Sequence, residues 1–115
     1  MPCNPMWGVK TPSKLHIELS GPANAGVTGS MEISSPAGSL QMRPLSRSDF
    51  PLDIDIDRGT SCGVMVALDF AGEETSVTVT SRVTGTSSRG PDVCTLNVAE
   101  GNEHEETNVT VAAEG

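Results

Sequence analysis

The chain has 115 residues, the length of one domain, and carries a net charge of −8 with only 7 basic residues. Binding to nucleic acid requires clustered lysine and arginine, so this charge argues against a nucleic-acid-binding protein and disfavours an anionic membrane surface. No apolar stretch approaches the length of a membrane-spanning helix, so we expect no membrane insertion.

The composition favours short strands joined by turns. Glycine contributes 12 residues and proline 8, and serine, threonine and valine are abundant relative to helix-forming residues. Aromatic residues make up only 3% of the chain. The core must therefore be built from valine, isoleucine, leucine and methionine.

The N-terminal segment MPCNPMWGVKTPSK contains no apolar stretch of the kind found in a secretory signal. We expect residues 1–14 to form an N-terminal arm and residues 15–115 to form a single β-sandwich domain. Within the arm, Trp7 either closes one end of the core or anchors the arm on a neighbouring protein, because tryptophan is enriched in both places.

Apolar and polar residues alternate in a series of short segments, with turn signals roughly every 8–12 residues. This period indicates β-strands, and no segment shows the spacing of an amphipathic helix. The segments are 15–19, 27–33, 40–42, 50–56, 62–70, 77–83, 94–98 and 109–113. A turn at 34–38 and a long loop at 84–92 are the clearest connections. We predict an all-β chain folded as a two-layer antiparallel β-sandwich of about eight strands, of immunoglobulin-like or jelly-roll type.

Segments 50–56 and 62–70 suggest a β-hairpin. If Arg58 lies opposite Cys62, a loop of residues 59–61 keeps the apolar residues of both strands on one side of the sheet. The pairs in this register are Ile56–Val64, Ile54–Val66, Leu52–Leu68 and Phe50–Phe70.

Three acidic residues of the first of these strands, Asp53, Asp55 and Asp57, alternate as ligands of a calcium site would. The glycine and the closing glutamate of an EF-hand loop are missing. Carboxylates two residues apart on a strand are also about 6.6 Å apart, so they do not easily close on one ion. We interpret the aspartates as a solvated face, with calcium binding as the alternative, and we expect no other cofactor.

The segment from Gly59 to Gly63 fits the pattern G-x-S-x-G, with Ser61 at its centre. A serine nucleophile of this type requires a helix after the turn and a histidine further along the chain. A predicted strand follows instead, and the one downstream histidine, His104, stands in an acidic loop. The cysteines and His16 also lack the spacing of a zinc site. We therefore predict that the protein is not an enzyme.

The three cysteines, Cys3, Cys62 and Cys94, cannot form an even disulfide framework. Cys62 and Cys94 both occupy apolar positions of predicted strands, so a Cys62–Cys94 disulfide in the core is one expectation. The alternative is two buried thiols that pack as small apolar groups.

Segment 62–70 is unusual because its second face, formed by Gly63, Met65 and Ala67, is not polar either. A strand that is apolar on both faces is usually covered on both. Either small residues are tolerated on the outside, or another chain or the N-terminal arm packs over Met65. We therefore select Trp7, Met65 and Ala67 as candidate interface residues.

Together these observations predict a non-enzymatic structural or interaction module. One concrete form is a subunit of a larger assembly, such as a capsid-decorating or tail-accessory protein of a phage or virus. Such a protein would self-associate or bind other proteins, and would lie on a virion or an extracellular surface. The alternative is a mature secreted or cell-surface domain of immunoglobulin-like type, adhesive or ligand-binding, which would depend on calcium if the aspartates bind an ion.

Overall fold

The computed structural model describes residues 3–35, 38 and 40–114, and these residues form an all-β fold with two sheets. The turn predicted over 34–38 includes residues 36 and 37, which lie outside the described residues. Apart from the short 3-10 helix η1 (Arg47–Asp49), every regular element of the described chain is a strand. None of its helices is long and apolar enough to cross a membrane.

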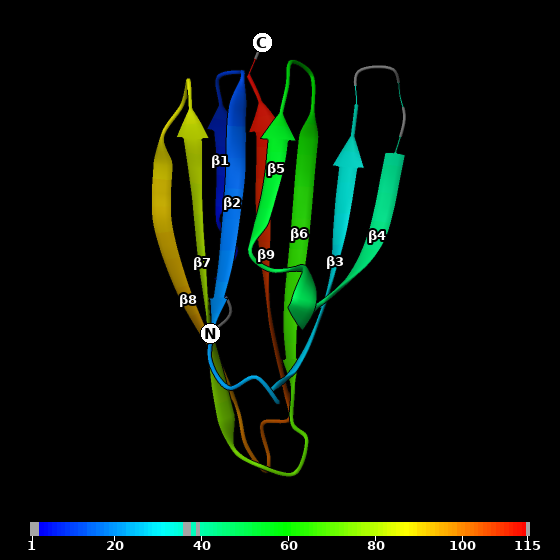
Figure 1. Cartoon of the computed structure of the whole chain (residues 1–115), viewed down its shortest axis with the longest axis vertical. Helices are drawn as coiled ribbons and strands as arrows, with labels where there is room; N and C mark the ends of the chain where they lie inside the picture. The colour runs from blue at the N-terminus through cyan, green and yellow to red at the C-terminus, as the bar shows by residue number, and fades with distance from the viewer. Residues whose placement is uncertain (1–2, 36–37, 39, 115) are drawn as a thin grey trace.

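The first sheet has five strands and the second has four. Across the first sheet the order is β1 (Met6–Val9), β9 (His104–Ala113), β6 (Ser61–Asp69), β3 (Gly26–Ser34) and β4 (Leu40–Ser46). Across the second it is β5 (Leu52–Ile56), β2 (Ser13–Ser20), β7 (Thr75–Gly85) and β8 (Arg89–Val98). Only the pairing of β1 with β9 is parallel among the described strands. Figure 1 shows β3 and β4 at one side of the molecule, beyond β5.

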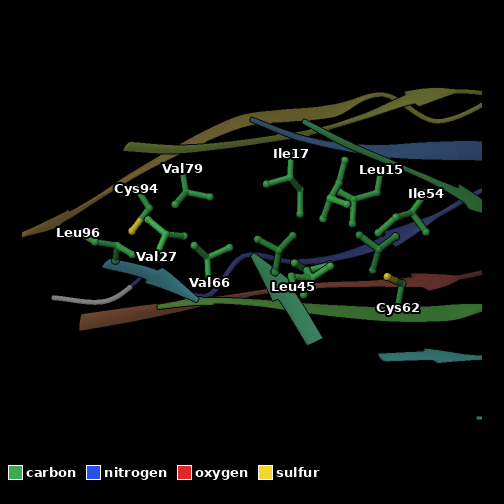
Figure 2. Packing of buried hydrophobic residues seen from close by; sticks show 14 of the residues in the cluster. Leu15, Ile17, Val27, Leu45, Ile54, Cys62, Val66, Val79, Cys94 and Leu96 are labelled. Carbon is green, nitrogen blue, oxygen red and sulfur yellow. The ribbon is translucent and has the colours of Figure 1, made fainter. Parts of the chain in front are cut away.

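The hydrophobic core combines alternate side chains from both sheets, which gives a β-sandwich-like arrangement (Figure 2). Leu15 and Ile17 of β2 are fully buried, as are Val66 and Leu68 of β6. Lys14 and Glu18 of β2 point to the other side and are exposed, as the two-residue period of a strand requires. Burying each such side chain stabilises the fold by about 1.5–3 kcal/mol. The inward positions predicted for these two strands are confirmed.

The predicted hairpin of β5 and β6 is wrong. β5 pairs with β2 in the second sheet, whereas β6 pairs with β3 and β9 in the first. The turn between them carries the chain from one sheet to the other, and the N–H of Thr60 donates a hydrogen bond to the carbonyl of Asp57 at 2.9 Å. Gly59 adopts a φ of 77° in this turn, which favours glycine. The apolar faces of β5 and β6 meet across the core. The alternation of apolar residues is the same whether two strands face each other in this way or pair as a hairpin, so it could not distinguish the two.

Much of the predicted N-terminal arm belongs to the sheets. β1 extends the first sheet beyond β9, and β2 begins at Ser13. Val9 is fully buried, and Trp7, two residues earlier on the same side of β1, packs against the core. The loop predicted over 84–92 is also shorter than expected, because β7 ends at Gly85 and β8 begins at Arg89.

Strand β4 buries the side that carries Leu45, whereas the sequence pattern indicated the side that carries Leu40 and Met42. Leu45 is only 5% exposed, whereas Leu40 is 54% and Met42 is 71% exposed. β4 is an edge strand of the first sheet and stands beyond the second sheet in Figure 1. Leu45 points to the core side of the first sheet, so Leu40 and Met42, which have the opposite parity along the strand, point to its outer side.

The expected Cys62–Cys94 disulfide is wrong. Cys94 is bonded to Cys3, with the two Cα atoms 5.8 Å apart, and Cys62 is a buried free thiol. The hydroxyl of Thr107 donates a hydrogen bond to the carbonyl of Cys3, which places Cys3 at the level of Thr107. Thr107 lies opposite Val66, which is four residues along β6 from Cys62. This offset corresponds to about 13 Å, and Figure 2 shows Cys62 and Cys94 at opposite ends of the core.

The two kinds of cysteine therefore have different roles. The Cys3–Cys94 bond ties the segment before β1 to β8, and so links the first sheet to the second. Burial raises the pKa of the Cys62 thiol to about 11, so this thiol stays protonated at neutral pH. Cys62 acts as a small apolar core residue.

Removing the disulfide should destabilise the protein strongly. The bond closes a loop with a sequence separation of 91 residues. A loop of this length contributes about 4–5 kcal/mol by limiting the freedom of the unfolded chain. We expect Cys3→Ser to lower the midpoint of denaturant unfolding, and a reducing agent to lower the wild-type midpoint by a similar amount.

The matched control is Cys62→Ala, which should keep the sensitivity to reducing agent because it leaves the bond intact. A wild-type midpoint that does not respond to reduction would contradict the assignment of this disulfide.

Candidate functional site

The outer face of the first sheet carries most of the exposed large apolar side chains. Met6 is 76%, Met42 71% and Leu40 54% exposed, and all three point to this side. The other exposed large apolar residue of the described chain is Val93, on edge strand β8 of the second sheet. We call this surface the methionine face, and it comprises Met6, Leu40, Met42, Pro44 and Met65.

The register of the strands arranges the methionine face in rows. Paired residues of neighbouring strands point to the same side of a sheet, and neighbouring strands are about 4.8 Å apart. The row that crosses all five strands contains Met6, Thr110, Gly63, Glu32 and Met42. The row beside it contains Asn108, Met65, Ser30 and Pro44. Two exposed methionines therefore flank a central strip of small and polar residues.

A hollow of about 270 Å³ lies in this central strip. Its lining residues are Glu32, Ser34, Ser61, Cys62, Gly63 and Thr110. No atom lies within 4 Å of the position that a Cβ of residue 63 would occupy, so the floor of the hollow at Gly63 is open. Glu32 is exposed beside it and forms no ion pair within the described chain. The hollow thus combines one carboxylate with three hydroxyl groups.

The free edge of β4 is poorly suited to pairing with another strand. Pro44 has no N–H to donate, and proline in a sheet is typical of protected edges. Arg43 adds a charge at this edge, where its guanidinium lies 3.8 Å from the carboxylate of Asp49. A partner would therefore contact the side chains of the methionine face rather than the backbone of β4.

Of the candidate interface residues from the sequence, the structure places Met65 on the methionine face, where it is half-buried. Ala67 is 2% exposed, so the chain itself covers this residue. Trp7 lies on the core side of β1, opposite Met6. β1 lies beside β9 at the edge of the sheet, and so does not pack over Met65.

The aspartates of β5 lie on the outer face of the second sheet, beside basic residues of β2. The carboxylate of Asp53 is 2.8 Å from the Nδ1 of His16, and that of Asp55 is 3.8 Å from the Nζ of Lys14. Asp57 is exposed in the turn that follows. The described residues contain no group of three His, Cys, Asp or Glu side chains that could hold a metal ion. Calcium binding by these aspartates stays a prediction.

His16 lies between two carboxylates, because its Nε2 is also 2.8 Å from the Oε1 of Glu18. A carboxylate oxygen only accepts hydrogen bonds, so the imidazole forms both bonds when both of its nitrogens are protonated. The hydrogen bonds that His16 donates to Glu18 and Asp53 raise the pKa of His16. The charged ring thereby links β2 to β5 through side chains.

The groups of the G-x-S-x-G pattern do not come together in the described chain. Ser61 begins strand β6, and a strand rather than a helix follows the turn. His104 binds the carboxylate of Asp69 at 2.6 Å, and this hydrogen bond raises the pKa of His104. Neither histidine is hydrogen-bonded to Ser61 in the described structure.

Comparison with known proteins gives no relative: no family model, no curated protein and no solved structure matches this chain. Function must therefore be argued from the surface itself.

Sequence reasoning identified one methionine of this face and missed the others. Met65 was found because segment 62–70 is apolar on both sides. Pro44 was an available signal for an edge strand, but it does not indicate which side of β4 faces the core. No sequence signal placed Met6 on the same face as these residues, because that requires the parallel pairing of β1 with β9.

The stability of the protein should decrease as the pH rises from 6 to 9. The pKa of His16 is raised in the folded state, so protonation favours folding. This contribution is complete below the ordinary pKa of 6.5 and is lost as the pH passes the folded pKa. We expect the thermal unfolding temperature to fall over this range, and His16→Gln to reduce the dependence on pH.

His104 contributes in the same direction, so a residual dependence on pH should persist in His16→Gln and disappear when His104→Gln is added. An identical pH profile for the wild type and His16→Gln would show that the imidazole does not stabilise the fold.

Proposed function

We propose that this protein is a non-enzymatic interaction module that docks into a larger protein assembly through the methionine face. The observation that carries the proposal is the concentration of exposed apolar side chains there, since three of the four such residues of the described chain lie on this surface. Exposed apolar side chains that gather on one face often mark a protein interface. Methionine suits such a surface because its flexible side chain adapts to a partner.

The concrete form that we propose is a subunit of an assembly that functions outside the reducing cytosol, such as a capsid-decorating or tail-accessory protein on a phage or virus particle. The Cys3–Cys94 bond supports this location, because disulfides persist in oxidising environments. The net charge of −8 disfavours nucleic acid as the partner, so we propose proteins, including further copies of the chain.

We further propose that the fold is immunoglobulin-like. In immunoglobulin domains strand B neighbours strand E, and strand C neighbours strand F. The pairings of β2 with β5 and of β3 with β6 are consistent with this relation. Such a fold supports many functions, so it adds nothing to the choice of partner.

A second candidate function is that of a mature secreted or cell-surface domain that adheres to another protein or binds a ligand. The same disulfide favours it, because small secreted domains often depend on such bonds. This candidate also uses the methionine face. It differs from the first because the protein would be secreted or displayed on a cell surface rather than built into a particle.

Association through the methionine face should be sensitive to charge at Met42. We expect the wild type to gain mass with concentration in sedimentation or light-scattering measurements. Met42→Lys should weaken this association by about tenfold or more, because it places a charge in an apolar contact. Its unfolding free energy should change by less than about 0.5 kcal/mol, since Met42 is 71% exposed.

Val93→Lys is the matched control, because it places the same charge on an exposed apolar residue of the other sheet. This variant should associate like the wild type. Self-association is contradicted if the wild type stays monomeric at every concentration, and the choice of face is contradicted if both variants behave alike.

A further inference from the structure

We propose that the hollow at Gly63 receives an arginine side chain of a partner protein that docks on the methionine face. This inference rests on the proposed docking function of the methionine face and adds the chemistry of the partner. Three features carry it: the hydrogen-bond acceptors of the hollow, the glycine at its floor and the charge of Glu32.

The acceptors surround the hollow on several sides. Glu32 and Thr110 stand on either side of Gly63 in the same row of the sheet, about 10 Å apart across two strand spacings. Ser61 and Ser34 form the next pair along the strands and also line the hollow. A guanidinium group is planar and has five N–H donors, which suits one carboxylate and several hydroxyl oxygens.

The backbone conformation does not explain why residue 63 is glycine. Gly63 is not among the glycines with a positive φ, and a Cβ at this position would meet no atom within 4 Å. Glycine in the middle of a strand weakens it, and often marks a place where a ligand or another chain approaches closely. The missing side chain at position 63 creates the hollow, so a partner group can lie against the strand itself.

The charge of the hollow selects a cation. Glu32 is the charged member of the row between Met6 and Met42. The nearest basic residue on β4, Arg43, points to the other side of the sheet and lies beside Asp49. A docked partner without a positive charge would bury the carboxylate of Glu32 unpaired, which is unfavourable.

Arginine fits this site better than the other cations that a protein environment offers. Lysine has three donors on a compact, strongly hydrated ammonium group, so it satisfies fewer acceptors and is harder to desolvate. A metal ion requires several ligands from one cluster, and the described residues contain no such cluster.

A titration followed by 15N NMR tests the proposal with two probe peptides, acetyl-Leu-Arg-Leu-amide and the same peptide with citrulline in place of arginine. Citrulline has nearly the same shape but no charge. We expect the arginine peptide to shift the backbone amide signals of Ser34, Ser61, Gly63 and Thr110. The citrulline peptide should bind about tenfold more weakly, because it lacks the charge-assisted hydrogen bond to Glu32.

Two variants locate the binding site. Gly63→Val fills the hollow with a residue that strands favour, so it should keep or raise thermal stability while it abolishes the shifts. Glu32→Gln should reduce the preference for arginine over citrulline. Thr95→Val, on the outer face of the second sheet, is the control and should leave the titration unchanged.

The proposal is overturned if the arginine peptide causes no shifts, if both peptides bind equally, or if Gly63→Val binds as the wild type does. Failure of the arginine proposal can be distinguished from failure of the proposal that the methionine face is a docking surface. If Met42→Lys weakens association but the peptide results are negative, the methionine face stands and the arginine site is wrong.

Discussion

The burial of alternate side chains between two sheets is the constraint on which the rest of the structure depends. β5 and β6 each direct one apolar set inward, and the turn from Asp57 to Thr60 carries the chain across the core so that these sets face each other. The opposite side of each strand then faces outward, and apart from Ala67 its residues are at least partly exposed. The strict two-residue period of a strand thus fixes which residues the molecule can offer to a partner.

The two outer faces differ in the residues that they expose. On the second sheet, Lys14 lies beside Asp55, and His16 lies between Asp53 and Glu18, so opposite charges meet within the chain. On the first sheet, Glu32 has no ion pair within the described residues, and exposed methionines stand at both edges. Three of the four exposed large apolar residues of the described chain lie on the first sheet, and this is the reason to assign the interaction to it.

Alternation in the sequence was sufficient to predict the all-β class and the inward residues of strands such as β2, β6 and β7, because burial on one face imposes that period. It could not predict which strands pair, since two alternating strands look the same side by side or face to face. The partner of Cys94 was missed for a related reason, because the position of Cys3 depends on contacts between the two ends of the chain. Of the candidate site, only Met65 could be found, because its neighbours on the methionine face come from distant strands.

The account depends most directly on the orientation of β4, which directs Leu45 into the core and Met42 to the surface. Methionine-methyl NMR with a soluble paramagnetic probe measures this orientation on the monomer. We predict strong broadening for the methyl groups of Met6 and Met42, less for Met65, and least for Met31, which packs against the core. A Met42 methyl group as protected as that of Met31 would contradict the account, because Met42 would then not be part of the methionine face.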